Sequence, residues 1–398
     1  MGGSLIFRWR HILEFFSGFN NHAGGNRWGD DPDPWIDTAS FVGGGMLNDA
    51  DAKFSVICGG CSNFIADDYG QYGTICGGYS NLVGSTAYER GQYGFVGGGY
   101  GNRASHNYSA VVGGKGNGAG EFSFVGGGEE NVVDGWFGRY SVICGGRDNR
   151  IGDCYHWAKF NFIGCGDTNE IYGNFNSILG GKMNLCDTTH FSLIGTGEAD
   201  TILGSSPNRV NHSGILTGTR NKIIKADYAL ILSGTDNTIQ ENGDNSIILG
   251  GSNNNITATY SLAFGREITA SSPYTAIFFS DDYPGKLGIN EENPAAELDV
   301  NGSAKINGAV INKFTITSGP YTIQPDDHTI FTSYQVNLPD ASANPGKVYY
   351  IKNTSSIETI PIYTLGGNID TASSYSLPPL GSIIVQSDGS NWWVIAEK

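Results

Sequence analysis

The sequence predicts an all-β protein, in which a parallel β-roll of about 13 coils precedes a C-terminal antiparallel β-sandwich. Three observations support this fold class. Glycine makes up 60 of the 398 residues, about twice its usual share. A nine-residue motif that ends in Asn recurs along most of the chain. After residue 312 glycine becomes scarcer and short alternating strands dominate.

The charge excludes two classes of partner. The formal net charge is -16 and the isoelectric point is about 4.7, so the chain repels nucleic acid and anionic membranes. The sequence contains no apolar run long enough for a transmembrane helix. We therefore expect neither nucleic-acid binding nor membrane insertion.

Residues 1–39 form the first segment, an attachment or capping region. Arg8, Arg10 and His11 interrupt its apolar positions, which argues against a secretory signal peptide. Its apolar residues fit one face of a short helix: Leu5, Ile6, Trp9, Ile12, Leu13 and Phe16. Such a helix either packs on the end of the fold or docks the chain onto a larger assembly.

Residues 40–268 carry the repeat. Its copies are SFVGGGMLN (40–48), SVICGGCSN (55–63), GTICGGYSN (73–81), GFVGGGYGN (94–102), SAVVGGKGN (109–117), SFVGGGEEN (123–131), SVICGGRDN (141–149), NFIGCGDTN (161–169), NSILGGKMN (176–184), SLIGTGEAD (192–200), SGILTGTRN (213–221), ALILSGTDN (229–237) and SIILGGSNN (246–254). DTILGSSPN (200–208) is a degenerate copy and YSLAFGREI (260–268) a worn last one. Fixed cores separated by loops of variable length are typical of a solenoid.

Two apolar columns define the coil. The third motif position is always Ile or Val, and Ile202 of the degenerate copy is assigned to this column. A second column, such as Ile65 and Val83, lies two residues after the Asn. β-Branched residues in fixed columns indicate two short strands per coil that stack in one interior. A Gly-x-x-Asn corner joins them: Gly supplies positive φ, and Asn tolerates the same region and can bond neighbouring backbone or its own copies in adjacent coils.

The residues that flank the Ile/Val column point to the opposite face, and they are apolar too. A large residue on one side of the column goes with a small one on the other, as Phe41 does with Gly43 and Val56 with Cys58. A strand that is apolar on both faces is buried on both. The second face therefore requires another chain or another layer of the same chain, and chains packed around a common axis fit best.

The segment that follows divides into a connector, residues 269–312, and a knob, residues 313–398. Asn301-Gly302 in the connector predicts a tight hairpin turn. The knob has seven or eight short strands separated by Pro, Gly, Asn and Asp, a pattern typical of a small sandwich. Trp392 and Trp393 are adjacent, so one ring faces inward and the other outward. The outward ring either meets a partner subunit or turn, or serves as a sugar platform.

These residues resemble two known groups of proteins. The S-h-I-x-G-G-x-x-N-x-I coil is similar to the left-handed parallel β-roll in the heads of trimeric autotransporter adhesins, although those coils carry Ser-Val-Ala-Ile-Gly. The stretch KLGINEENPAAELDVNGSAKING (286–308) resembles a connector of phage tail fibre proteins. The resemblance implies a homotrimer on the surface of a phage or a phage-like contractile injection particle. It also implies that the N-terminus attaches to the baseplate or tail.

Glycine and cysteine patterns point to structure rather than to a cofactor or metal. Lys115 and Lys182 follow glycines, but no Ser or Thr comes next, so a phosphate-binding loop is not expected. Cys58 and Cys61 have no second pair or spaced His that would complete a zinc site. The acidic stretch DDPDPWID (30–37) fits a solvated cap better than a cation site. The repeat also lacks the Asp of calcium-binding coils.

The function expected from the sequence is that of a fibre protein without enzymatic activity. A rigid spacer presents loops or a knob to a glycan or protein on the host surface. The candidate receptor-binding residues are Trp392, Tyr69, Tyr72, Tyr155 and Trp157. Two alternatives remain open: a cell-anchored adhesin, and a glycan depolymerase that uses two carboxylates. The loop acids are Asp67, Asp68, Glu89, Asp134, Asp153, Glu170 and Asp187, and no spacing distinguishes a pair among them.

Overall fold

The computed structural model describes residues 18–24, 39–66, 69–85, 91–153, 157–204 and 210–398. It contains two compact units, Met1–Asp299 and Val300–Lys398. In the described ranges no helix has the length and hydropathy needed to cross a membrane. The helix predicted within residues 5–16 lies outside them.

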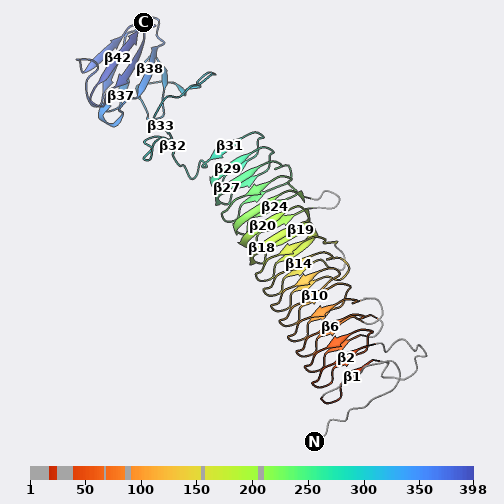
Figure 1. Cartoon of the computed structure of the whole chain (residues 1–398). Coiled ribbons are helices and arrows are strands. Elements are labelled where there is room, and N and C mark those ends of the chain that lie inside the picture. Colours follow the sequence, from red (N-terminus) through yellow and green to blue (C-terminus); the bar gives the residue numbers. More distant parts are fainter. Residues whose placement is uncertain (1–17, 25–38, 67–68, 86–90, 154–156, 205–209) are drawn as a thin grey trace. The chain divides into compact units, whose positions relative to one another are not determined.

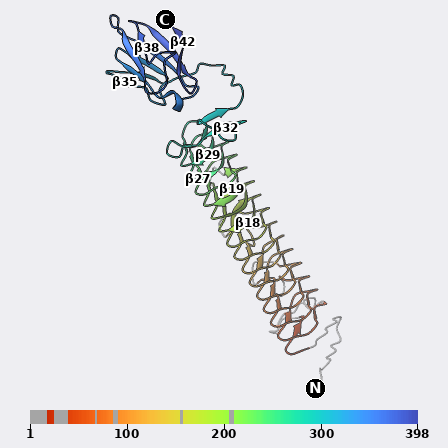
Figure 2. The same ribbon diagram turned by 90° about the vertical axis from the view of Figure 1, so that its left-hand side faces the viewer.

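The first unit is a parallel β-solenoid, in which successive coils stack in a regular row (Figures 1 and 2). Each coil contributes one strand to each of two sheets. Sheet 1 has 15 strands in the order β2 (Phe41–Val42), β4 (Val56–Ile57), β6 (Thr74–Ile75), β8 (Phe95–Val96), β10 (Ala110–Val111), β12 (Phe124–Val125), β14 (Val142–Ile143), β16 (Phe162–Ile163), β18 (Ser177–Lys182), β20 (Leu193–Glu198), β23 (Gly214–Thr219), β25 (Leu230–Ile231), β27 (Ile247–Ser252), β29 (Leu262–Arg266) and β31 (Ala276–Phe278).

Sheet 2 lies on the other side of the interior and has 16 strands. Its order is β1 (His22–Ala23), β3 (Asp49–Ala50), β5 (Phe64–Ile65), β7 (Leu82–Val83), β9 (Arg103–Ala104), β11 (Gly118–Ala119), β13 (Val132–Val133), β15 (Arg150–Ile151), β17 (Glu170–Asn174), β19 (Leu185–His190), β21 (Thr201–Leu203), β24 (Lys222–Ile224), β26 (Thr238–Ile239), β28 (Asn255–Ile256) and β30 (Thr269–Ala270), with β22 (Val210–Asn211) paired to β19.

The interior consists of the two predicted apolar columns. Ile57 and Ile75 in sheet 1, and Ile65 and Val83 in sheet 2, are fully buried, as are their counterparts along the stack. Neighbouring strands are parallel and in register, so like residues lie above like residues. The predicted β-roll is confirmed.

Two details of the predicted coil arrangement are wrong. Sheet 1 has 15 strands rather than 13, because β29, in the worn copy at 260–268, and β31 continue the stack past the thirteen clear copies. Ile202 belongs to sheet 2, where it pairs with Cys186 and Ile223. The sequence DTIL (200–203) mimics the start of a motif, but its residues Thr201–Leu203 form the strand that follows the corner.

The Gly-x-x-Asn corner confirms that Gly supplies positive φ, but the Asn does not adopt that region. Positive φ falls on the second Gly and on the residue before the Asn, as in Gly60 (95°) and Ser62 (57°). A Cβ at Gly60 would lie 2.3 Å from the Gly78 carbonyl oxygen, so no other residue fits there. The Asn itself forms the predicted ladder with its copies. Asn131 is fully buried, and its Nδ2 donates to the carbonyls of Gly127 (2.9 Å) and Gly146 (2.8 Å).

The outward face of sheet 1 has two rows, formed by the residues before and after each interior position. The first row is Phe41, Val56, Thr74, Phe95, Ala110, Phe124, Val142, Phe162, Ser177, Leu193, Gly214, Leu230, Ile247, Leu262 and Ala276. The second row is Gly43, Cys58, Cys76, Gly97, Val112, Gly126, Cys144, Gly164, Leu179, Gly195, Leu216, Leu232, Leu249, Phe264 and Phe278. A Cβ at Gly126 would lie 3.4 Å from the Phe124 ring, so this ring covers the glycine. Within one chain, a large side chain in the first row therefore covers the small residue beside it in the second row. This pairing keeps the outward face of sheet 1 flat.

A small two-stranded sheet, β32 (Leu287–Ile289) and β33 (Leu298–Val300), comes next along the chain. The second unit then has a five-stranded sheet, β34 (Phe314–Ile316), β36 (Thr329–Thr332), β38 (Val348–Asn353), β41 (Ser382–Ser387) and β42 (Trp392–Glu397), and a four-stranded sheet, β35 (Tyr321–Thr322), β37 (Val336–Leu338), β39 (Ile360–Thr364) and β40 (Ser374–Leu377). The 3-10 helix η1 (Ala341–Ala343) follows β37.

The sheets of the second unit are mixed, not antiparallel as predicted. β34, β36 and β38 are parallel, as are β35, β37 and β39, and only β40, β41 and β42 pair antiparallel. Strands therefore alternate between the two sheets up to β39, as they do in a solenoid. Alternating apolar residues predict such strands but do not fix the direction of their neighbours.

Candidate functional site

A ladder of exposed aromatic rings runs along the corner that precedes sheet 1. Its unbroken part consists of Phe54, Tyr72, Tyr93, Tyr108, Phe122, Tyr140, Phe160, Phe175, Phe191, His212 and Tyr228. Adjacent ring centroids are 4.8 to 5.1 Å apart, and the rings are nearly parallel. Each residue has a positive φ, for example 57° at Tyr140, which turns the chain into the following strand. Sequence reasoning missed this ladder.

The ladder offers ring edges to a ligand rather than ring faces. Tyr72 is 44% exposed, yet it stacks between Phe54 at 5.1 Å and Tyr93 at 4.8 Å. Sugars bind on open aromatic faces, and both faces of Tyr72 are occupied by its neighbours. The candidate residue Tyr72 is thus part of the solenoid's own stacking and has no free platform.

Replacing Tyr140 by leucine is expected to destabilise the solenoid by about 1–2 kcal/mol, because two stacked pairs, with Phe122 at 4.9 Å and Phe160 at 5.0 Å, are lost. Chemical denaturation followed by circular dichroism would measure the change. Tyr140→Phe keeps the ring and serves as the control. An equal loss in both variants would contradict the role of stacking.

The other candidates fall in different surroundings. Tyr69 is half-buried, and Tyr155 lies outside the described residues. Trp157 is 50% exposed on the loop between β15 and β16. Its ring centroid is 4.5 Å from the Lys159 Nζ and 5.1 Å from the Phe137 ring. The exposed Trp157 and the half-buried Phe137 therefore form an aromatic pair beside a cation, outside the regular ladder.

The tryptophan assignment in the knob requires correction. Trp392 is fully buried, and its indole N–H donates to the Pro339 carbonyl at 2.9 Å. Trp393 is the exposed member of the pair (43%), and its N–H donates to the Asp388 carboxylate at 2.7 Å. Strand alternation predicts that one ring is buried, but not which one. Of the two, only Trp393 presents a ring to the surface.

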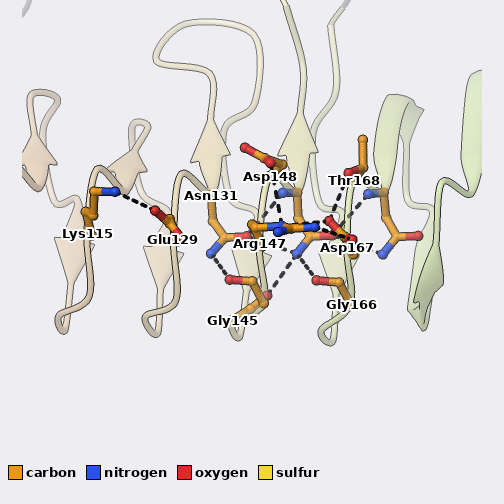
Figure 3. A network of polar contacts seen from close by, with 12 residues as sticks. Lys115, Glu129, Asn131, Gly145, Arg147, Asp148, Gly166, Asp167 and Thr168 are labelled. Carbon is orange, nitrogen blue, oxygen red and sulfur yellow. Dashed lines mark hydrogen bonds and ion pairs between the residues drawn. The ribbon is translucent and has the colours of Figure 1, made fainter.

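A second ladder, of charged residues, follows the Gly-x-x-Asn corner (Figure 3). Lys115, Glu129, Arg147 and Asp167 occupy successive coils. The Lys115 Nζ lies 2.6 Å from Glu129, and Arg147 forms a two-pronged contact of 3.1 and 2.7 Å with Asp167. The hydrogen bonds from Arg147 lower the pKa of the Asp167 carboxyl. Such exposed pairs contribute little stability, but they make this edge of the solenoid charged and polar.

His22, Asp49 and Asp51 form the one group of potential metal ligands found among the described residues. The His22 Nδ1 lies 2.8 Å from Asp49 and 2.9 Å from Asp51. Hydrogen bonds to the two carboxylates raise the pKa of His22 to about 10, and burial raises the pKa of Asp51 to about 6. A protonated His22 bridges the acids as an ion pair, which disfavours a metal because a metal needs neutral imidazole.

Two of the loop acids have structural roles. Asp134 accepts the backbone N–H groups of Trp136 (3.2 Å) and Phe137 (3.1 Å), and so closes a turn. Asp187 accepts the Thr188 hydroxyl at 2.9 Å. Asp67, Asp68 and Glu89 lie outside the described residues.

The comparisons with known proteins do not place the chain in a family. Neither a search of known protein families nor a search of curated proteins finds a match. The structure therefore defines only a class of architecture: a long parallel β-solenoid and a smaller β-rich C-terminal unit.

Proposed function

We propose that the chain is a fibre protein on the surface of a phage or of a phage-like injection particle, where it binds a host-cell surface. The observation that carries the proposal is the unbroken stack of sheet 1 from Phe41 to Phe278, whose interior is filled at every coil. Fifteen coils about 4.8 Å apart give a length of roughly 70 Å. A rod of this kind suits a spacer better than a catalyst.

The N-terminal coils offer a surface for attachment to the particle. One row of residues runs along the Gly-x-x-Asn corners, and further along the chain it becomes the charged ladder. In the N-terminal coils this row carries Phe19 (67% exposed), Met46 (44%), Tyr79 (46%) and Tyr100 (54%). This apolar row ends where Lys115 begins the charged ladder. An apolar patch confined to one end supports docking through the N-terminus onto a baseplate or tail.

The host-binding contacts in this proposal lie where the repeat is interrupted. The loop that carries Trp157 and Lys159 and the exposed Trp393 of the knob are the two candidates. A glycan or protein receptor can use such exposed rings. Several copies, three in the arrangement that the resemblance implies, would raise weak contacts to useful avidity.

The test is binding of the fluorescently labelled full chain to a panel of bacterial strains. We expect saturable binding to some strains, reduced about tenfold or more by Trp157→Ala or by Trp393→Ala, since each removes a large contact surface. Tyr140→Phe serves as the control that leaves binding unchanged. Absence of saturable binding on every strain would refute the proposal, and release of reducing ends from capsule would favour a depolymerase instead.

A further inference from the structure

The outward face of sheet 1 is apolar and uncovered in the single chain. Val112 is 48% exposed, Leu179 49%, Leu216 41% and Phe264 42%. These side chains come from coils spread over most of the solenoid. Because rings such as Phe124 cover neighbouring glycines such as Gly126, the face is flat. A flat face favours close packing against another flat face.

The two rows of this face contain no charged residue, although the chain carries a net charge of -16. Charges do occur on the outward side of sheet 2, for example Arg103, Arg150 and Lys222. Two copies of an acidic chain repel each other, and only a face without charge lets them approach closely. An oppositely charged partner would instead be recognised through charged rows.

The size of the face matches that of a stable interface. With a length of roughly 70 Å and a width of roughly 10 Å, it offers about 700 Å², close to the ~800 Å² that each partner contributes in a standard complex. Uncovered apolar patches on monomers rarely exceed a few hundred Å². A partner must also supply an equally long apolar ladder with the same strand spacing.

We propose that the outward face of sheet 1 is the interface with a second copy of this chain. The second copy provides an equally long, flat and uncharged ladder. The inference rests on the proposed assembly from several copies, but not on binding to a cell. It assigns Cys58, Cys76 and Cys144, which are exposed in the single chain, to the interior of the assembly.

The cysteines allow a direct test on the full-length protein. A short pulse of N-ethylmaleimide would be followed by denaturation, a second, isotopically labelled maleimide, and mass spectrometry of the peptides. Cys165 is exposed on the Gly-x-x-Asn corner, outside the face, and Cys186 is buried in the interior; they are the two references. We expect Cys58, Cys76 and Cys144 to react at least about tenfold more slowly than Cys165, and light scattering to give a multiple of 42.4 kDa.

A variant separates protection by a partner from intrinsic reactivity. Val112→Asp places a charge in the face without touching the interior, so the fold should persist by circular dichroism while the mass falls to that of one chain. Cys144 should then react about as fast as Cys165, and Cys76 should react faster than in the unmodified protein, although burial and the neighbouring Cys58 raise the pKa of its thiol in the single chain too. Thr238→Asp, on the outward side of sheet 2, is the matched control and should leave the assembly intact.

The outcomes are distinguishable. A mass of 42.4 kDa for the unmodified protein would overturn both the assembly and this interface. A multiple of that mass with Cys58, Cys76 and Cys144 as reactive as Cys165 would overturn the interface alone. A mass that includes a different protein would also overturn it. Failure of cell binding with protected cysteines would leave the interface supported.

Discussion

Asn131→Leu is expected to destabilise the solenoid by about 4 kcal/mol or more. The substitution removes the donor to the Gly127 and Gly146 carbonyls and the acceptor for the Asn149 backbone N–H at 3.2 Å. Each of these three buried groups, once left without a partner, costs about 1–3 kcal/mol. Leucine has the same branching and number of heavy side-chain atoms as Asn, so the substitution leaves no cavity and removes the hydrogen bonds.

Hydrogen exchange and chemical denaturation together would measure this effect. In a repeat protein each coil contacts mainly its neighbours, so amides around Asn131 should lose protection before those near Asn254. Asn312→Leu changes an exposed Asn in the connector and is the matched control. Equal protection of all coils in Asn131→Leu would argue against the ladder as a source of stability.

The solenoid is predictable from the sequence because its constraints repeat. Each interior column must be filled at every coil, so Ile or Val recurs at a fixed distance from Gly and Asn, and the pattern is visible in one chain. The error at Ile202 arises because Asp200 ends one motif and also begins a string of letters that resembles the next. Strand direction in the knob depends on long-range pairing, which no local pattern records.

The aromatic ladder was hidden by variable loops. Measured from the preceding Asn, its members occur at irregular distances, but each lies three residues before the interior Ile, Val or Ala, as Tyr140 precedes Ile143. Alignment on the following column would have revealed it. The choice between Trp392 and Trp393 depends on how β42 packs against its sheet, and alternation alone leaves it open.

Asp200 is the acidic member of the Asn ladder, and Asp200→Asn is expected to stabilise the protein by about 1–3 kcal/mol at pH 7. Asp200 is fully buried, and its Oδ1 accepts the Asn221 backbone N–H (2.8 Å) and Nδ2 (3.1 Å). Its Oδ2 has no hydrogen-bond partner within the described part of the chain. In the other coils an amide NH₂ at this position donates to the glycine carbonyl of the next coil, as Asn184 does to Gly197. Asparagine at position 200 restores that donor.

The gain should depend on pH in a defined direction. Burial raises the pKa of the Asp200 carboxyl above its ordinary value, so the folded state holds this proton more tightly than the unfolded state. Stability of the natural chain therefore falls as the pH rises from the unfolded pKa of about 3.9 through the raised folded value, and then levels off. The variant lacks this loss, so its advantage should be small at pH 4 and largest at neutral pH.

Urea denaturation at a series of pH values between 4 and 8 would measure the difference. Asp187→Asn alters a half-buried acid on the outward side of sheet 2 and should retain the pH dependence of the natural chain. An advantage of Asp200→Asn that is constant with pH would show that Asp200 is already neutral in the folded protein throughout this range. A loss of stability at neutral pH would show that the carboxylate has a partner that asparagine cannot replace.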